Sequence, residues 1–292
     1  MRSSTISKYY SDTSKYKNLE YPSFKYEKVA VSGVGKDRLP FVNMDEYYDT
    51  NLNSSLYSEC LVGLSLCSFK DFKFGNIVGG IPSFEKKIYG DTDSWTETLD
   101  NIMYLDPTGM HRNNIDTILS RSDDAFMAVQ RYMSMAMGAT IPWYFACHLY
   151  SNTFENKGVA TGTYTDAIRH FPNLLYFIKT LPFKEVGRIM FFTSYPNGGV
   201  VTHRDNTQEA HKDHSINFFF KSGRPSFIWD PVNEKKLYLD KGVCSYFFNN
   251  RDYHGVDPEP TFQFTLRVDG TFEDYVQQEL GLEDGYTWKS EY

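Results

Sequence analysis

The chain has 292 residues, of which 41% are hydrophobic, 23% charged and 17% aromatic. This is the composition of a globular protein with one large domain or two modest ones, and it excludes intrinsic disorder as the default state. The formal net charge is −7 and no run of five or six like charges occurs, so we do not expect a nucleic-acid partner.

The four cysteines are too few and too scattered for a disulfide framework or a Cys-x-x-Cys metal site: Cys60, Cys67, Cys147 and Cys244. Such usage suits a reducing compartment. No segment approaches the ~18 consecutive apolar residues of a membrane span, and the first residues lack the apolar core of a secretory signal. We therefore expect a cytoplasmic protein without a membrane partner.

The N-terminal half predicts a mixture of elements. Residues 26–90 combine short β-type runs with Gly and Pro, which favours a few strands and loops over long helices. Residues 114–138 have good helix formers and apolar residues at three-to-four spacing, which predicts a helix. A second helix is predicted over residues 165–181, with Pro172 kinking it or splitting it in two.

After residue 183 the pattern changes to short β-branched or aromatic runs separated by turn residues. This series predicts an α+β fold with a double-stranded β-helix core, that is, a cupin-like jelly roll, over residues 141–292. Residues 1–140 are expected to form an N-terminal α/β extension whose strands and helix pack on the core and line part of the substrate pocket, in one compact domain overall.

The stretch "THRDN" contains a candidate metal-binding pair. On a strand, His203 and Asp205 point to the same face while Arg204 points away. His254, in "NNRDYHGVDPE", is far enough along the chain to return beside them. Two histidines and one carboxylate form the facial triad of non-haem Fe(II) oxygenases. The alternative is that the pair is accidental, because most histidines are structural or exposed.

Arg267 lies beyond His254, in the strand "FQFTLRVDG", where Thr265, Arg267 and Asp269 share a face. An arginine that points into an apolar barrel needs an anion beside it. A dicarboxylate cosubstrate supplies one, and the planar guanidinium suits it. The alternative is a salt bridge to Asp269 or Glu259 at the rim of the barrel.

Residues 188–269 resemble the 2-oxoglutarate- and Fe(II)-dependent oxygenases, most closely the aspartyl/asparaginyl β-hydroxylase and proline hydroxylase-like branch. The features that carry the resemblance are, in order, "GRIMFFTSYPNGG", "HRDN", "KDHSINFFF", "LDKGVCSYFFNNRDYHGV" and "TLRVDG". They cover under a third of the chain.

The resemblance implies roles for individual residues. His203, Asp205 and His254 match the iron ligands and are the expected catalytic centre. Arg267 is the expected partner of the cosubstrate carboxylate.

Three further residues are candidates for binding the cosubstrate. Arg188 is the alternative to Arg267. Lys212 and His214 fall where the branch has an arginine-x-histidine pair that contacts the cosubstrate, although lysine lacks the planar guanidinium.

The activity that the resemblance implies needs Fe(II), O2 and 2-oxoglutarate as cosubstrate. It hydroxylates an unactivated C–H bond of an amino acid, free or within a peptide, and releases succinate and CO2. Family members that halogenate have a small residue where this chain has Asp205, which favours hydroxylation. Two other classes stay open, namely a cupin-like metal-binding protein without turnover and a Zn or Mn hydrolase or isomerase that uses His203 and Asp205 as an acid/base pair.

Overall fold

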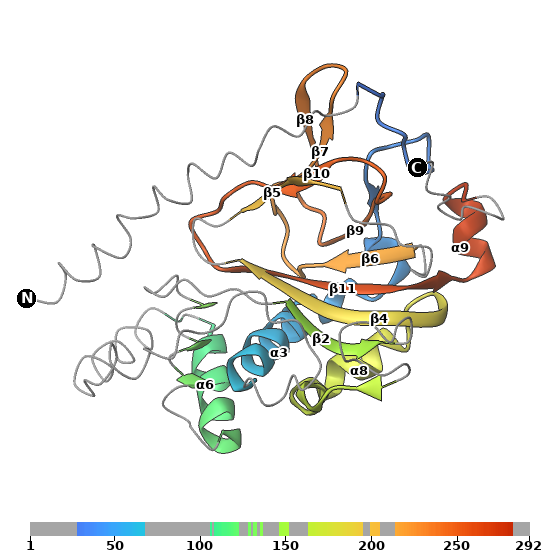
Figure 1. The fold of residues 1–292 in the computed structure, drawn as a ribbon. Helices are drawn as coiled ribbons and strands as arrows, with labels where there is room; N and C mark the ends of the chain where they lie inside the picture. The colour runs from blue at the N-terminus through green and yellow to red at the C-terminus, as the bar shows by residue number, and fades with distance from the viewer. Residues whose placement is uncertain are drawn as a thin grey trace, which may run out of the picture.

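The computed structural model describes residues 28–67, 106, 108–122, 128–129, 131–132, 135–136, 146–151, 163–194, 199–204 and 214–282. Asp205 and Lys212 lie outside these ranges. The described part consists of two antiparallel sheets and a few short helices (Figure 1). None of its helices is long and apolar enough to cross a membrane.

The larger sheet has seven strands in the order β1-β9-β6-β11-β4-β2-β3. Its centre is the long pair of β4 and β11, which face each other over most of their length. The bounds are β1 Val42–Asn43, β9 Ser245–Phe247, β6 His214–Phe218, β11 Gln263–Phe272, β4 Phe183–Ser194, β2 Ala146–Ser151 and β3 Thr163–Tyr164.

The smaller sheet has four strands in the order β5-β10-β7-β8. They are β5 Val200–His203, β10 His254–Val256, β7 Ser226–Asp230 and β8 Lys235–Tyr238. Along the chain, the strands from β4 to β11 pass back and forth between the two sheets. The runs that the sequence predicts as strands after residue 183 are therefore confirmed.

One face of the larger sheet is directed toward the smaller sheet, which lies above it in Figure 1. Ser226 Oγ on β7 lies 3.3 Å from Tyr246 Oη on β9, so the two sheets are joined by a hydroxyl pair. Ile228, Tyr246 and Phe248 belong to one buried apolar cluster between them. Side chains that alternate with these point to the other face of each sheet.

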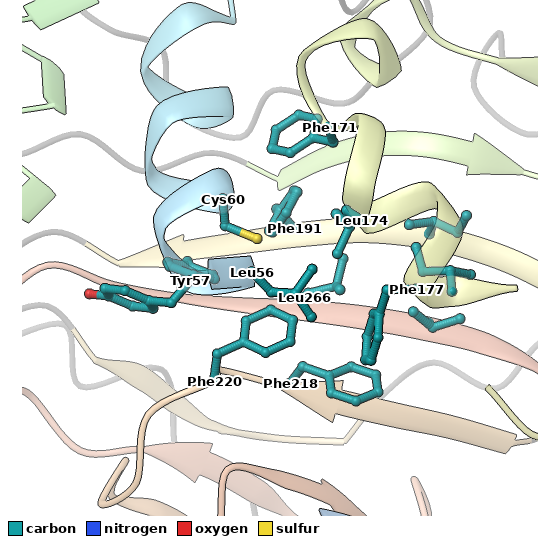
Figure 2. Close-up of a cluster of buried hydrophobic side chains, with 14 of the residues drawn as sticks. Leu56, Tyr57, Cys60, Phe171, Leu174, Phe177, Phe191, Phe218, Phe220 and Leu266 are labelled. Carbon is teal, nitrogen blue, oxygen red and sulfur yellow. The ribbon is translucent and has the colours of Figure 1, made fainter. Parts of the chain in front are cut away.

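The opposite face of the larger sheet is covered by helices. Phe191 on β4, Phe218 on β6 and Leu266 on β11 pack with side chains of α3 (Asn53–Leu66) and α8 (Pro172–Ile178), as Figure 2 shows. The ring centroids of Phe177 and Phe218 are 5.3 Å apart at an interplanar angle of 78°, an edge-to-face contact. This core fixes the sheet whose inner face carries the arginine cluster described below.

The expectation of strands and loops over residues 26–90 is wrong at α3, a helix of 14 residues. Tyr57, Cys60, Leu61 and Leu64 recur at helical spacing and are buried, so packing against the sheet stabilises the helix despite its four serines and its glycine. In this region β1 is the only strand that the described residues contain.

The predicted helix over residues 114–138 is also corrected. The helix α6 runs Met110–Arg121, and Ser122 is extended, with φ −103° and ψ 132°. Serine favours helix ends because its side chain competes for backbone hydrogen bonds. Helical geometry resumes at the described residues between 128 and 136.

The split at Pro172 is confirmed. A short 3-10 helix, η4, covers Asp166–His170, and α8 begins at Pro172 itself. Proline is favoured as the first residue of a helix because its missing N–H has no partner there. The described part of the chain also contains η1 Asp45–Tyr47, η2 Thr50–Leu52 and α9 Asp274–Glu279.

Candidate active site

His203 and His254 face each other across neighbouring strands. His203 is the last residue of β5, His254 is the first of β10, and the two are direct partners in the antiparallel register. Their ring centroids lie 4.4 Å apart at an interplanar angle of 55°. The structure thus brings together two of the three predicted metal ligands.

The tautomer of His254 follows from its hydrogen bond. Its Nδ1 atom lies 3.0 Å from the backbone oxygen of Asp252. A carbonyl oxygen only accepts, so Nδ1 carries the proton and Nε2 carries the lone pair. Metal-binding histidines commonly have such a backbone partner, because it fixes both the ring orientation and the tautomer. His254 therefore fits a metal ligand that binds through Nε2.

The loop before His254 is held by the N-terminal segment of the described chain. Ser32 donates from its N and Oγ atoms to Asp252 Oδ1, at 3.2 and 3.1 Å. Asn249 Nδ2 donates to the carbonyl oxygen of Gly33 at 3.0 Å. Burial raises the pKa of Asp252, and the bonds from Ser32 oppose that rise. This bracing fixes the carbonyl that orients His254.

The third predicted ligand is not described. No group of three His, Cys, Asp or Glu side chains is placed to hold a metal within the described ranges. Asp205 follows His203 by two positions and lies outside the described residues. The pair of imidazoles fits a metal centre, and the role of Asp205 stays a prediction.

The predicted arginines meet on a buried carboxylate. Arg267 Nε donates to Asp269 Oδ1 at 2.6 Å, and Arg188 Nε donates to Asp269 Oδ2 at 2.7 Å. Arg188 Nη2 also pairs with Oδ2. Asp269 on β11 and Arg188 on β4 are direct partners in the register. Of the two alternatives for Arg267, the salt bridge to Asp269 is therefore present, and it lies in the interior rather than at a rim.

In this cluster, two guanidinium groups share one carboxylate. Only 11% of the Arg267 side chain, 17% of the Arg188 side chain and 1% of the Asp269 side chain are exposed. Guanidinium groups donate strong, directional hydrogen bonds to anions. The chemistry of the cluster therefore suits an anionic ligand.

Two polar side chains beside the cluster were not predicted. Ser215 and Asn217 on β6 pair in register with Asp269 and Arg267 on β11. Among the described residues, Ser215 Oγ and Asn217 Nδ2 are buried and have no hydrogen-bond partner. Buried polar atoms are nearly always hydrogen-bonded in functioning proteins, so these two donors fit a bound ligand. The alternation in "HSINF" is the sequence signal that places both on one face.

His214 is not brought to this cluster. It precedes Ser215 on β6 and so points to the opposite face, where its ring stacks on that of Phe272 with centroids 4.7 Å apart. Its Nδ1 atom accepts a hydrogen bond from the Phe272 N–H at 3.0 Å. Burial lowers its pKa to about 4. The geometry assigns His214 to the packing of the sheet. Lys212 lies outside the described residues.

Comparisons with known proteins found no matching family model and no matching curated protein. Among solved structures, a prolyl hydroxylase from Trichoplax adhaerens, in complex with a hypoxia inducible factor peptide fragment, is 15% identical with a TM-score of 0.27. That match covers 48% of this chain and 66% of the other chain, just under two thirds.

Two further solved structures match with similarly low identities and TM-scores. A Pseudomonas putida prolyl-4-hydroxylase is 11% identical, with a TM-score of 0.29, over 55% of this chain and 88% of the other. An oxidoreductase of the 2OG-Fe(II) oxygenase family from Burkholderia pseudomallei is 10% identical, with a TM-score of 0.30, over 43% and 67% of the two chains. Because these identities and TM-scores are low, we base the proposed function on the residues of the site.

Proposed function

We propose that this protein is a 2-oxoglutarate- and O2-dependent Fe(II) oxygenase. It hydroxylates an unactivated C–H bond of an amino acid, free or within a peptide, and releases succinate and CO2. The observation that carries the proposal is the pair His203 and His254, which face each other across β5 and β10 with ring centroids 4.4 Å apart.

The strand order supports a double-stranded jelly roll as the core. Strands β4 to β11 lie in two facing sheets, with β9-β6-β11-β4 in one and β5-β10-β7-β8 in the other. Each sheet thus combines strands that are far apart in the sequence, as expected for two interleaved Greek keys. In such a core, His203 and His254 lie on the smaller sheet, and the arginine cluster lies on the larger one.

His203, Asp205 and His254 are the residues that would hold the iron. When bound, Fe(II) in such a triad offers open positions to O2 and to a chelating keto acid. The chain supplies the orientation, because the Asp252 carbonyl fixes the His254 ring. Phe248, whose ring centroid is 4.7 Å from that of His254, adds an apolar wall. The carboxylate of Asp205 favours hydroxylation over halogenation.

The far carboxylate of 2-oxoglutarate is assigned to the cluster of Arg188, Asp269 and Arg267. Guanidinium groups can donate charge-assisted hydrogen bonds to a carboxylate, and such bonds are strong when they are buried. Asp269 holds the Arg267 guanidinium in a fixed orientation through the 2.6 Å bond to Nε. Ser215 Oγ and Asn217 Nδ2, buried beside the cluster, add two neutral donors.

Succinate formation from 2-oxoglutarate tests the proposal and separates it from the alternatives. We expect succinate only when Fe(II) and O2 are both present, and we expect His254→Ala to abolish it. His111→Ala is the matched control, because His111 lies on α6 and is bonded to Tyr132 Oη through Nδ1 at 2.8 Å. Turnover of a substrate without O2 would instead support a hydrolase or isomerase, and metal binding without any turnover would support a cupin-like binding protein.

A further inference from the structure

Arg224, just before β7, is a buried arginine with unsatisfied donors. Its exposed fraction is 7%, and in the part of the chain that the structure describes its Nε and Nη1 atoms have no hydrogen-bond partner. Burial lowers its pKa from the ordinary value of arginine. Because arginine nevertheless stays protonated in proteins, Arg224 is a buried cation whose Nε and Nη1 donors find no acceptor among the described residues. Such a group is strongly unfavourable unless a ligand supplies its anion.

The surroundings of Arg224 connect it to the metal-binding histidines. Tyr246 lies close enough to Arg224 to raise its pKa against the effect of burial, and the Tyr246 phenol oxygen lies 3.3 Å from Ser226 Oγ. Tyr246 stacks on Phe248, and Phe248 contacts the ring of His254. Arg224 therefore belongs to the same interior between the sheets as His254.

Arg224 is separate from the arginine cluster already described. Tyr246 on β9 is the register partner of Asn217 on β6, and Asn217 is the partner of Arg267 on β11. Two strand spacings correspond to about 10 Å between the backbones at Tyr246 and Arg267. Among the described residues, the Arg267 guanidinium has the Asp269 carboxylate beside it, whereas Arg224 Nε and Nη1 have no hydrogen-bond partner.

We propose that Arg224, with the hydroxyl groups of Tyr246 and Ser226, forms a second carboxylate-binding position in this interior. One guanidinium and two neutral hydroxyls match a single negative charge, whereas a phosphate dianion would leave one charge uncompensated. The planar guanidinium also matches a planar carboxylate. Apolar neighbours of Tyr246, which include Phe41, Ile228 and Phe248, keep the local dielectric low and strengthen the pairing.

Two molecules can supply this carboxylate. The identity of both rests on the proposed function. One is the cosubstrate, whose far carboxylate would then bind Arg224 in place of the cluster of Arg188, Asp269 and Arg267. The other is the substrate, which would then be an acid with an accessible carboxylate, such as a free amino acid rather than an internal residue of a peptide. The binding of a carboxylate at Arg224 itself requires neither iron nor turnover.

The test is carboxylate-dependent stabilisation of the metal-free, full-length protein. Thermal unfolding is followed with 2-oxoglutarate, with 2-oxobutyrate, which lacks the second carboxylate, and with L-proline, L-aspartate and L-asparagine. Arg224→Met removes the charge and preserves the apolar stem. We expect its unliganded unfolding midpoint to be equal to or above that of the natural chain, and carboxylate affinity to fall at least about tenfold.

Lys221→Met is the matched control. It removes the same charge three positions away, where Lys221 Nζ lies over the Tyr57 ring at 4.0 Å from its centroid. We expect this variant to keep the carboxylate affinity of the natural chain.

The source of the carboxylate follows from which compounds lose affinity. If Arg224→Met binds 2-oxoglutarate more weakly and 2-oxobutyrate equally well, the carboxylate belongs to the cosubstrate. If the variant binds only the amino acids more weakly, the carboxylate belongs to the substrate. The inference is overturned if no carboxylate stabilises the natural chain, if Arg224→Met binds all of them normally, or if that variant unfolds earlier without ligand. Failure of the proposed function would appear separately, as absent O2-dependent succinate formation with the Arg224-dependent stabilisation intact.

Discussion

Arg267 donates from Nε to Asp269 Oδ1 at 2.6 Å, between two side chains on the same face of β11. Because Asp269 is almost fully buried and also accepts from Arg188, one carboxylate fixes two guanidinium groups. This pairing orients both guanidinium groups. Its contribution to the stability of the fold can be measured.

Asp269→Asn removes the buried carboxylate that accepts hydrogen bonds from both Arg188 and Arg267. We expect the free energy of unfolding to fall by about 3–5 kcal/mol, since breaking a buried ion pair strands its partner. Urea unfolding followed by circular dichroism measures the change. Asp274→Asn is the control, because Asp274 pairs with Lys184 with 82% of its side chain exposed, and we expect an effect below ~1 kcal/mol. Equal effects of the two substitutions would contradict the buried cluster.

His214 gives the protein a pH-dependent stability. Burial lowers its pKa from 6.5 to about 4, so between these values the unfolded chain binds a proton that the folded chain does not. The contribution of neutral His214 to the free energy of unfolding is complete above about pH 6.5. It declines by up to about 3 kcal/mol as the pH falls toward 4.

His214→Gln measures that contribution, because the glutamine oxygen can still accept the Phe272 N–H. Unfolding free energies of the two proteins are compared at several values between pH 4 and pH 7. We expect the natural chain to lose more stability than the variant as the pH falls. Parallel pH profiles would show that His214 is not buried in its neutral form.

Gly255 sets the distance between the strands that carry the two histidines. A Cβ atom added there would lie 2.6 Å from the carbonyl oxygen of Val200 on β5 and 2.6 Å from the ring of Phe227 on β7. The Val200 carbonyl oxygen can move away only if its strand moves, so we expect Gly255→Ala to displace β5. Loss of support for a metal ligand weakens metal binding, so we expect Fe(II) affinity to fall at least about tenfold.

Gly270→Ala is the control for this effect. Its added Cβ would lie 2.2 Å from the Glu185 carbonyl oxygen, at the end of β11 that pairs with β4 and away from the histidines. Equilibrium binding of Fe(II) under anaerobic conditions compares the two variants. We expect both to be destabilised and only Gly255→Ala to bind iron more weakly. Equal iron affinity in the two variants would contradict the role of the β5–β10 contact.

Local signals predicted the elements near the site well. The alternating and aromatic runs after residue 183 became strands, and Pro172 marked the start of α8 because proline has no N–H to donate. The pattern "THRDN" with a distant histidine predicted that His203 and His254 would meet. Such features depend on residues close in sequence, or on a strand order typical of one fold.

Features that depend on tertiary packing were not predicted. The helix α3 depends on the sheet beneath it, and His214 was assigned to the cosubstrate because its face of β6 was unknown. Arg224 carries no sequence signal, since an arginine before a proline resembles an exposed loop residue. Its burial arises only when β7 and β9 bring Ser226 and Tyr246 together.

The central claim is that His203 and His254 hold an iron ion, and that 2-oxoglutarate chelates this ion. The most direct measurement is the visible absorption spectrum of the anaerobic protein after addition of Fe(II) and then 2-oxoglutarate. We predict a weak charge-transfer band of the chelated complex, present in the natural chain and in His111→Ala, and absent in His203→Ala and His254→Ala. The absence of the band from the natural chain, or its persistence in His203→Ala, would contradict the account.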